Sequence, residues 1–207
     1  MTLYIDGHSE RYELQALCLL FFAGEGAALR EGAPPDGDER FVHTRLHEEA
    51  EGLRLFVRVC LSGECREAGG SLPHTEDHIR ITHAFARLLY PILCNLTGIT
   101  PPWGMLTGVR PVKLFLRRLE AGMSPEAVEN YFCTEQAVSR EKARLACETA
   151  LVQRSLPELD EKRVALYVSI PFCPTRCRYC SFVSQTIERA GHLLRPYAEK
   201  LERELQL

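Results

Sequence analysis

Three cysteines lie within eight residues near the end of the sequence, at Cys173, Cys177 and Cys180, in the spacing C-x3-C-x2-C. Thiolates crowded on one short loop repel one another, so their natural partner is a cation or a cluster that takes up their charge. Three protein ligands on a four-iron cluster leave one iron without a thiolate, and an open coordination position distinguishes a reactive centre from a closed structural one. The spacing therefore predicts an iron–sulfur centre with one open position.

Two other interpretations of the triplet stay open. A structural zinc ion could take His192 as its fourth ligand, although the gap between Cys180 and His192 matches no common zinc pattern. The three cysteines could also be unliganded core residues, but Pro174 and the arginines around it are typical of an exposed loop.

The residues before the triplet have the composition of a buried strand. Residues 163–170 form a short apolar run that Pro171 ends, as in a strand covered on both faces of a parallel sheet. The cysteine loop would then follow the carboxyl end of a strand, where barrel enzymes place their chemistry.

The run YVSIPFC at 167–173, together with the triplet, resembles the opening of a radical S-adenosylmethionine barrel. It is most similar to the oxygen-independent coproporphyrinogen III oxidase family, whose members read Y-x-H-I-P-F-C-x-x-x-C-x-x-C. The form CPTRCRYCSF, preceded by PPWGMLTGVRP at 101–111, looks like the HemZ-type branch, which carries an extra N-terminal region. The resemblance covers the chain from about Thr97 to its end.

The resemblance implies that Cys173, Cys177 and Cys180 hold a [4Fe-4S] cluster and that S-adenosylmethionine fills the open iron position. Tyr179 matches an aromatic residue near the adenine, and Tyr167 a tyrosine near the cluster and cofactor. The implied function is oxygen-independent oxidative decarboxylation of coproporphyrinogen III to protoporphyrinogen IX in haem biosynthesis. It would start from a 5′-deoxyadenosyl radical, with an electron donor such as flavodoxin or ferredoxin as partner.

Two positions depart from the pattern of the family. Ser169 stands where a histidine is usual, and Phe182 stands where an additional cysteine follows the triplet. The phenylalanine form also occurs in a related branch that delivers haem, so the alternative function is a haem-binding chaperone. A zinc-binding interaction module is the third hypothesis.

The last segment, 159–207, is predicted to be the first βα unit of a truncated α/β barrel of the partial TIM type. After the cysteine loop one amphipathic helix carries Tyr197, Leu201 and Leu205, and only 44 residues run from Val164 to Leu207. A strand that is apolar on both faces and open at both edges is not stable alone. We therefore expect a fragment that ends inside the barrel, inactive by itself and cut readily by proteases between Leu156 and Val164.

Residues 1–98 are predicted to form a small α+β domain in the order β-α-β-β-α. A strand at 2–6 is followed by a helix capped by Ser9, and a mobile loop at 25–40 leads into a hairpin of 41–46 with 53–59. A helix from about Thr75 to Gly98 contains Pro91, which should kink it or break it in two.

Residues 99–158 are predicted to be a turn-rich linker followed by helices. Trp103 would pin the linker to a domain surface, and a second interpretation is an anion site where Pro111 opens a helix beside Arg110 and Lys113. Three helices are expected within 111–154, with later starts at Pro125 and Thr134. Cys133 and Cys147 would be small buried residues of these helices.

The composition is that of an ordinary globular protein. Of 207 residues, 45% are hydrophobic and 26% charged, and the formal net charge of −3 does not favour nucleic acid or anionic membranes as partners. No run is long enough to span a membrane and no signal peptide is visible, so the chain is predicted to be cytoplasmic. Its nine cysteines are an odd number, which does not favour a secreted disulfide scaffold, and clustered thiols in a reducing compartment more often bind metal. Six histidines before Trp103 show no metal-binding spacing and are assigned surface or packing roles.

Overall fold

The computed structural model describes residues 1–22, 24–108, 110–156, 164, 166–175, 177 and 180–206. The contacts within the chain divide it into two units, Met1–Leu156 and Pro157–Leu207, and each is described by itself. Within the described residues, no helix is long and apolar enough to cross a membrane.

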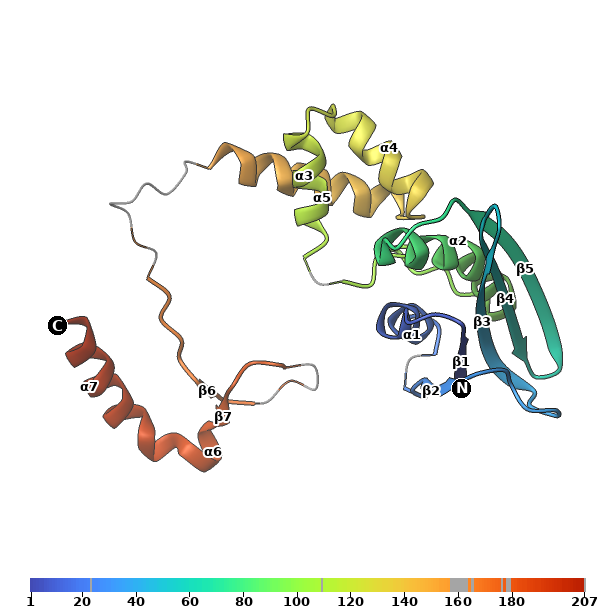
Figure 1. Ribbon diagram of the computed structural model, residues 1–207. Helices are drawn as coiled ribbons and strands as arrows, with labels where there is room; N and C mark the ends of the chain where they lie inside the picture. The colour runs from blue at the N-terminus through green and yellow to red at the C-terminus, as the bar shows by residue number, and fades with distance from the viewer. Residues whose placement is uncertain are drawn as a thin grey trace. The chain divides into compact units, whose positions relative to one another are not determined.

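The first unit contains a five-stranded sheet in the spatial order β2-β1-β3-β4-β5 (Figure 1). Strand β1 runs parallel to both of its neighbours, and β3, β4 and β5 form an antiparallel meander. The strands are β1 (Thr2–Asp6), β2 (Ala28–Glu31), β3 (Arg40–Glu49), β4 (Gly52–Leu61) and β5 (Glu64–Leu72).

Two helices, α1 (Arg11–Leu19) and α2 (His78–Thr97), pack against the sheet. The strands meet them with alternating side chains, because a strand turns every second residue to the same face. In β4, Leu55, Val57 and Val59 are fully buried in this core, which also takes Leu14 from α1 and Phe85 from α2.

The predicted strand at 2–6 and the predicted hairpin are confirmed, with longer hairpin strands than expected. The mobile loop expected at 25–40 is wrong in part, since β2 lies inside it and pairs with β1. An edge strand needs backbone pairing more than apolar side chains, so its sequence carries little signal. The predicted element order also lacks β5, whose two glycines and charges hide its strand character.

Helix α2 continues through Pro91, so the expected break into two helices does not occur. Pro91 is exposed, while Phe85, Leu89 and Leu93 are fully buried against the sheet. This packing holds the backbone helical on both sides of the proline. Asp77 caps the start of α2, and the helix ends as expected at Gly98, which has a φ of 69°.

The start of α1 differs from the prediction. Its N-cap is Glu10, and no side chain caps it, so Ser9 does not have the expected role. The backbone N–H of Ser9 instead donates to the buried Glu10 carboxylate at 3.0 Å.

The three helices expected within 111–154 are confirmed as α3 (Val112–Glu120), α4 (Pro125–Glu135) and α5 (Arg140–Ser155). They share a core in which the rings of Phe115 and Phe132 stack with centroids 3.7 Å apart. Ser124 caps α4 as expected, but α5 starts at a cap formed by Ser139. Thr134 starts no helix, because its hydroxyl bonds back to Asn130 O within α4.

The segment before α3 is anchored as predicted by Trp103, which packs against the core of the three helices. The free N–H groups expected at the start of α3 are not found at Lys113 and Leu114, which donate to Arg110 O and Pro111 O. The first turn of α3 thus satisfies these two donors internally. Cys147 is buried as predicted, and Cys133 is half-buried.

The second unit contains a parallel pair of short strands, and it ends in a helix of three turns (Figure 1). Its elements are β6 (Phe172–Cys173), β7 (Gln185–Thr186), α6 (Ile187–Ala190), a 3-10 turn (Gly191–Leu193) and α7 (Leu194–Leu205).

The buried strand predicted at 163–170 is not found. The described residues of this run, Val164 and 166–170, belong to no strand and are all exposed. A strand needs a partner for its backbone on at least one edge, and β7 pairs with Phe172 and Cys173, beyond Pro171. The expected protease-sensitive stretch, 157–163, lies outside the described residues.

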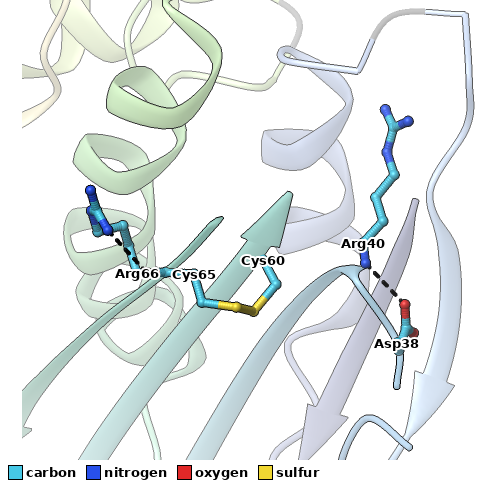
Figure 2. The surroundings of a disulfide bond; sticks show 5 residues. All are labelled: Asp38, Arg40, Cys60, Cys65 and Arg66. Atoms are coloured by element: carbon cyan, nitrogen blue, oxygen red, sulfur yellow. Dashed lines mark hydrogen bonds between the residues drawn. A yellow bond between two sulfur atoms is a disulfide. The ribbon is translucent and has the colours of Figure 1, made fainter. Parts of the chain in front are cut away.

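A disulfide joins Cys60 and Cys65 across the turn between β4 and β5 (Figure 2). The two residues are direct partners in the antiparallel register, with Cα atoms 4.1 Å apart. Cys60 is buried beside Tyr4 and Phe41 on the sheet face opposite the helices. The sequence, which indicated a reducing compartment, did not predict this bond.

Candidate metal centre

Cys173 is placed by strand β6, where it pairs with Thr186 of β7. The N–H of Gln185 donates to Pro171 O at 2.8 Å, which fixes the chain just before the first cysteine. Cys173 is half-buried, and its thiol forms no disulfide. The first predicted ligand thus sits on hydrogen-bonded backbone at the start of the loop.

A backbone hydrogen bond joins Cys177 and Cys180. The N–H of Cys180 donates to Cys177 O at 3.1 Å, which holds the backbones of the two residues together. Cys177 is exposed and Cys180 is half-buried, and both are free thiols. Cysteines on an exposed loop are open to a metal centre from solvent, unlike the buried Cys18 and Cys147 of the first unit.

The donor set suits an iron–sulfur cluster, because three free thiols on eight residues are the soft ligands that such clusters take. Their arrangement is more open than that of a bound site. Within the described part of the chain, no three His, Cys, Asp or Glu side chains lie close enough together to hold a metal ion. His192, the alternative zinc ligand, is exposed on the 3-10 turn and is not gathered with the cysteines into such a group.

Of the two tyrosines expected near the cofactor, the structure describes one. The side chain of Tyr167 is 79% exposed, so it is accessible but makes no pocket of its own. Tyr179 lies outside the described residues. Phe182, the position that departs from the family pattern, is exposed.

Ser169 is held by the last helix. The hydroxyl of Tyr197 in α7 donates to Ser169 O, and the Tyr197 ring meets Phe172 edge-on with centroids 5.4 Å apart. Helix α7 therefore positions the backbone on both sides of Pro171. The stripe predicted on this helix is half-buried at Tyr197 and Leu201 and exposed at Leu205.

A polar cluster around the buried carboxylate of Glu10 in the first unit was not predicted from the sequence. The Glu10 carboxylate lies 3.1 Å from Nδ1 of His8 and 2.8 Å from Nδ1 of His78, while Nε2 of His8 lies 3.0 Å from the hydroxyl of Thr44. Glu10 and His78 are 68 positions apart, so no local spacing could reveal their contact. The sequence predicts packing and surface roles for the histidines, and His8 does stack on Phe85.

The pKa values of this cluster follow from burial and hydrogen bonding. Burial lowers the pKa of His8, although the neighbouring Glu10 opposes the shift. Burial by itself raises the pKa of Glu10, but hydrogen bonds, first that from His78, lower it overall. The same contact raises the pKa of His78. The cluster thus favours an ionised Glu10 beside a protonated His78.

No family model matches the chain. The chain is 32% identical over 212 residues to the "Oxygen-independent coproporphyrinogen-III oxidase-like protein HemZ" of Bacillus subtilis (strain 168). The match takes in 93% of this chain, and it spans 40% of the length of that relative. It includes most of the first hundred residues, which carry no recognisable motif of their own. The resemblance to the HemZ-type branch of the oxygen-independent coproporphyrinogen III oxidase-like proteins, predicted from the cysteine loop, is therefore confirmed.

Proposed function

We propose that this chain provides the cluster-binding loop of a radical S-adenosylmethionine protein that acts on coproporphyrinogen III in haem biosynthesis. The observation that carries the proposal is the set of three free thiols at Cys173, Cys177 and Cys180, on a loop that the similarity to HemZ includes. The first strand of the corresponding barrel would be built from the run before Pro171.

The three cysteines would hold a [4Fe-4S] cluster through their thiolates and leave one iron to S-adenosylmethionine. When bound, such a cluster supplies one-electron reduction of that cofactor. Strand β6 fixes the position of Cys173, and the backbone hydrogen bond between Cys180 and Cys177 limits the separation of the other two ligands. Tyr197 supports this loop by holding the backbone at Ser169.

The apolar side chains before the loop support the same proposal. Val164, Leu166 and Ile170 are each more than 60% exposed, which is costly for an isolated segment in water. In a barrel these side chains would be covered by neighbouring strands and helices. Their burial would also exclude water from the first cysteine.

The test is anaerobic reconstitution of the 207-residue chain with iron and sulfide. We expect about four irons per chain, an absorption band near 400 nm, and an electron paramagnetic resonance signal after dithionite reduction that changes when S-adenosylmethionine is added. Replacing Cys173, Cys177 or Cys180 singly by serine should abolish this signal. Cys133→Ser is the matched control, since Cys133 is also a free, half-buried thiol.

A colourless chain that contains zinc and no iron would overturn the proposal in favour of a zinc-binding module. The reaction itself is tested with the full-length protein that the gene encodes. Formation of 5′-deoxyadenosine together with loss of coproporphyrinogen III supports the enzyme. Stoichiometric haem binding without that product contradicts it and selects the chaperone alternative.

A further inference from the structure

A cleft of about 950 Å³ lies within the first unit, at the upper end of the range of roughly 300 to 1,000 Å³ that small-molecule sites occupy. Its walls come from the start of α1, the first half of α2, residues 105–107, and the facing sides of α3 and α4. It contains none of the cysteines of the proposed metal centre.

The cleft has an apolar base and an apolar mouth. Leu14, Leu17 and Phe132 are buried and line its base. Tyr12 and Ile79 also line it, but they are 78% and 80% exposed. Large apolar side chains left in water at the edge of a concave site favour a ligand with an apolar body, since covering them removes that surface from water.

Three guanidinium groups line the same cleft, from Arg80 on α2 and from Arg117 and Arg118 on α3. Arg118 lies over the ring of Tyr131, with its guanidinium carbon 3.4 Å from the ring centroid. Arg80 and Arg117 form no ion pair with any carboxylate of the described residues, in contrast to Arg87, which pairs with Glu135 from a position further along α2. Two cationic groups on separate walls are therefore available to a ligand.

The remaining charges of the cleft leave a positive excess. The lining carboxylates are Glu10 and Glu13, and Glu10 is already hydrogen-bonded to His78. A smaller pocket of about 350 Å³ shares Arg117 with the cleft and adds Arg110 and Lys113. Guanidinium groups bind carboxylates through paired hydrogen bonds, so this charge pattern favours an anionic ligand.

We infer that the cleft between α1, α2, α3 and α4 binds a carboxylate carried on an apolar body, with Arg80 and Arg117 holding the carboxylate groups. The apolar body lies over Leu14, Leu17 and Phe132 and covers Tyr12 and Ile79. Two kinds of molecule share this chemistry, a flat ring with several carboxylates and a fatty acid chain with one. The inference goes beyond the proposed function and does not depend on a cluster.

The inference is tested by fluorescence titration of the cluster-free 207-residue chain with two probes. Coproporphyrin III represents the ring that carries several carboxylates. Laurate represents the fatty acid, and its binding is measured by displacement of a fluorescent fatty acid. We expect at least one probe to bind at micromolar concentration and to bind at least tenfold more weakly to Arg80→Gln/Arg117→Gln. The control Arg54→Gln/Arg144→Gln changes the net charge equally at two exposed arginines outside the cleft and should bind as the unmodified chain does.

Two further variants test whether the ligand occupies the cleft itself. Ala121→Trp fills the mouth of the cleft from the exposed end of α3 without changing its charge, and it should also weaken binding at least tenfold. Circular dichroism checks that each variant is folded. Cys173→Ser/Cys177→Ser/Cys180→Ser should bind the probe normally, which separates this inference from the proposed function.

Preference for coproporphyrin III assigns the ring class, and preference for laurate assigns the chain class. The inference is overturned if neither probe binds, or if the cleft variants bind as the arginine control does. Loss of binding in the triple cysteine variant would also overturn it, because the ligand would then lie at the cysteine loop.

Discussion

Oε1 of Glu10 lies 2.8 Å from Nδ1 of His78 and so joins the start of α1 to the start of α2. Glu10 is only 4% exposed, and its other oxygen accepts the Ser9 N–H at 3.0 Å and lies 3.1 Å from Nδ1 of His8. This carboxylate therefore connects two helices that both pack on the sheet, at the edge of the arginine-lined cleft.

Replacing Glu10 by glutamine should lower the free energy of unfolding by about 1 to 2 kcal/mol, because the Glu10 carboxylate is buried beside His8 and accepts the Ser9 N–H, while solvent screens its contact with the exposed His78. Urea unfolding at pH 7, followed by circular dichroism, measures this loss. Glu13→Gln, one turn along α1, removes the same charge from a residue that makes no ion pair within the described residues and should change stability by less than about 0.5 kcal/mol. Equal effects of the two substitutions would contradict a special role for Glu10.

Acidification should destabilise the first unit through His43. Burial lowers the pKa of His43, Asp6 at 3.9 Å opposes this shift, and Arg45 and Arg58 add to it. A histidine whose pKa is lower in the folded state contributes its stability above its unfolded pKa of about 6.5, and that stability is lost as the pH falls below it. His8 shifts in the same direction, and the exposed His78, whose pKa its contact with Glu10 raises, shifts in the opposite direction.

The measurement is the free energy of unfolding in urea between about pH 7.5 and pH 5, a range that spans the unfolded pKa of histidine. His43→Gln should flatten the decline over this range, because glutamine does not titrate. His47→Gln, an exposed histidine further along β3, should keep the slope of the unmodified chain. A slope that His43→Gln leaves unchanged would mean that other groups cause the acid sensitivity.

Gly104 should tolerate no side chain. Its φ is 58°, and a Cβ atom there would lie 2.0 Å from the backbone oxygen of Gln136. That oxygen accepts the N–H of Met105 at 2.8 Å, so it cannot move away without breaking the bond. Gly104→Ala should cost about 3 kcal/mol of stability, through the strained backbone and the clash together.

Gly108→Ala is the matched control for this prediction. No atom lies within 4 Å of a Cβ placed at Gly108, and its φ is not in the left-handed region. Urea unfolding should show a change of less than about 0.5 kcal/mol for this variant. If Gly104→Ala were equally mild, the close contact between residues 104 and 136 would be refuted.

Reduction of the Cys60–Cys65 disulfide should lower the stability of the first unit by about 2 kcal/mol, because the bond closes a loop of only six residues in the unfolded chain. Urea unfolding with and without dithiothreitol measures the difference. Cys60→Ala/Cys65→Ala should unfold identically under both conditions. A dithiothreitol effect that persists in this variant would place its cause at another cysteine.

Much of the first unit could be predicted, because its signals are local. Leu55, Val57 and Val59 alternate along one strand, and Leu14, Leu17 and Cys18 recur at helical spacing, so each pattern indicates its element without knowledge of the rest. Strands β2 and β5 could not be predicted in this way. Each is defined by the partner strand to which its backbone bonds, and its own side chains are mostly exposed.

The same distinction applies to the functional residues. The spacing of Cys173, Cys177 and Cys180 was sufficient to propose a chemistry, because ligands on one short loop can meet at a metal centre whatever the rest of the fold, and the run before them indicated the family. The pairing of Glu10 with His78, the Cys60–Cys65 bond and the arginine-lined cleft were decided only by the tertiary structure. They join residues from separate elements, and only packing against a common core brings such residues into contact.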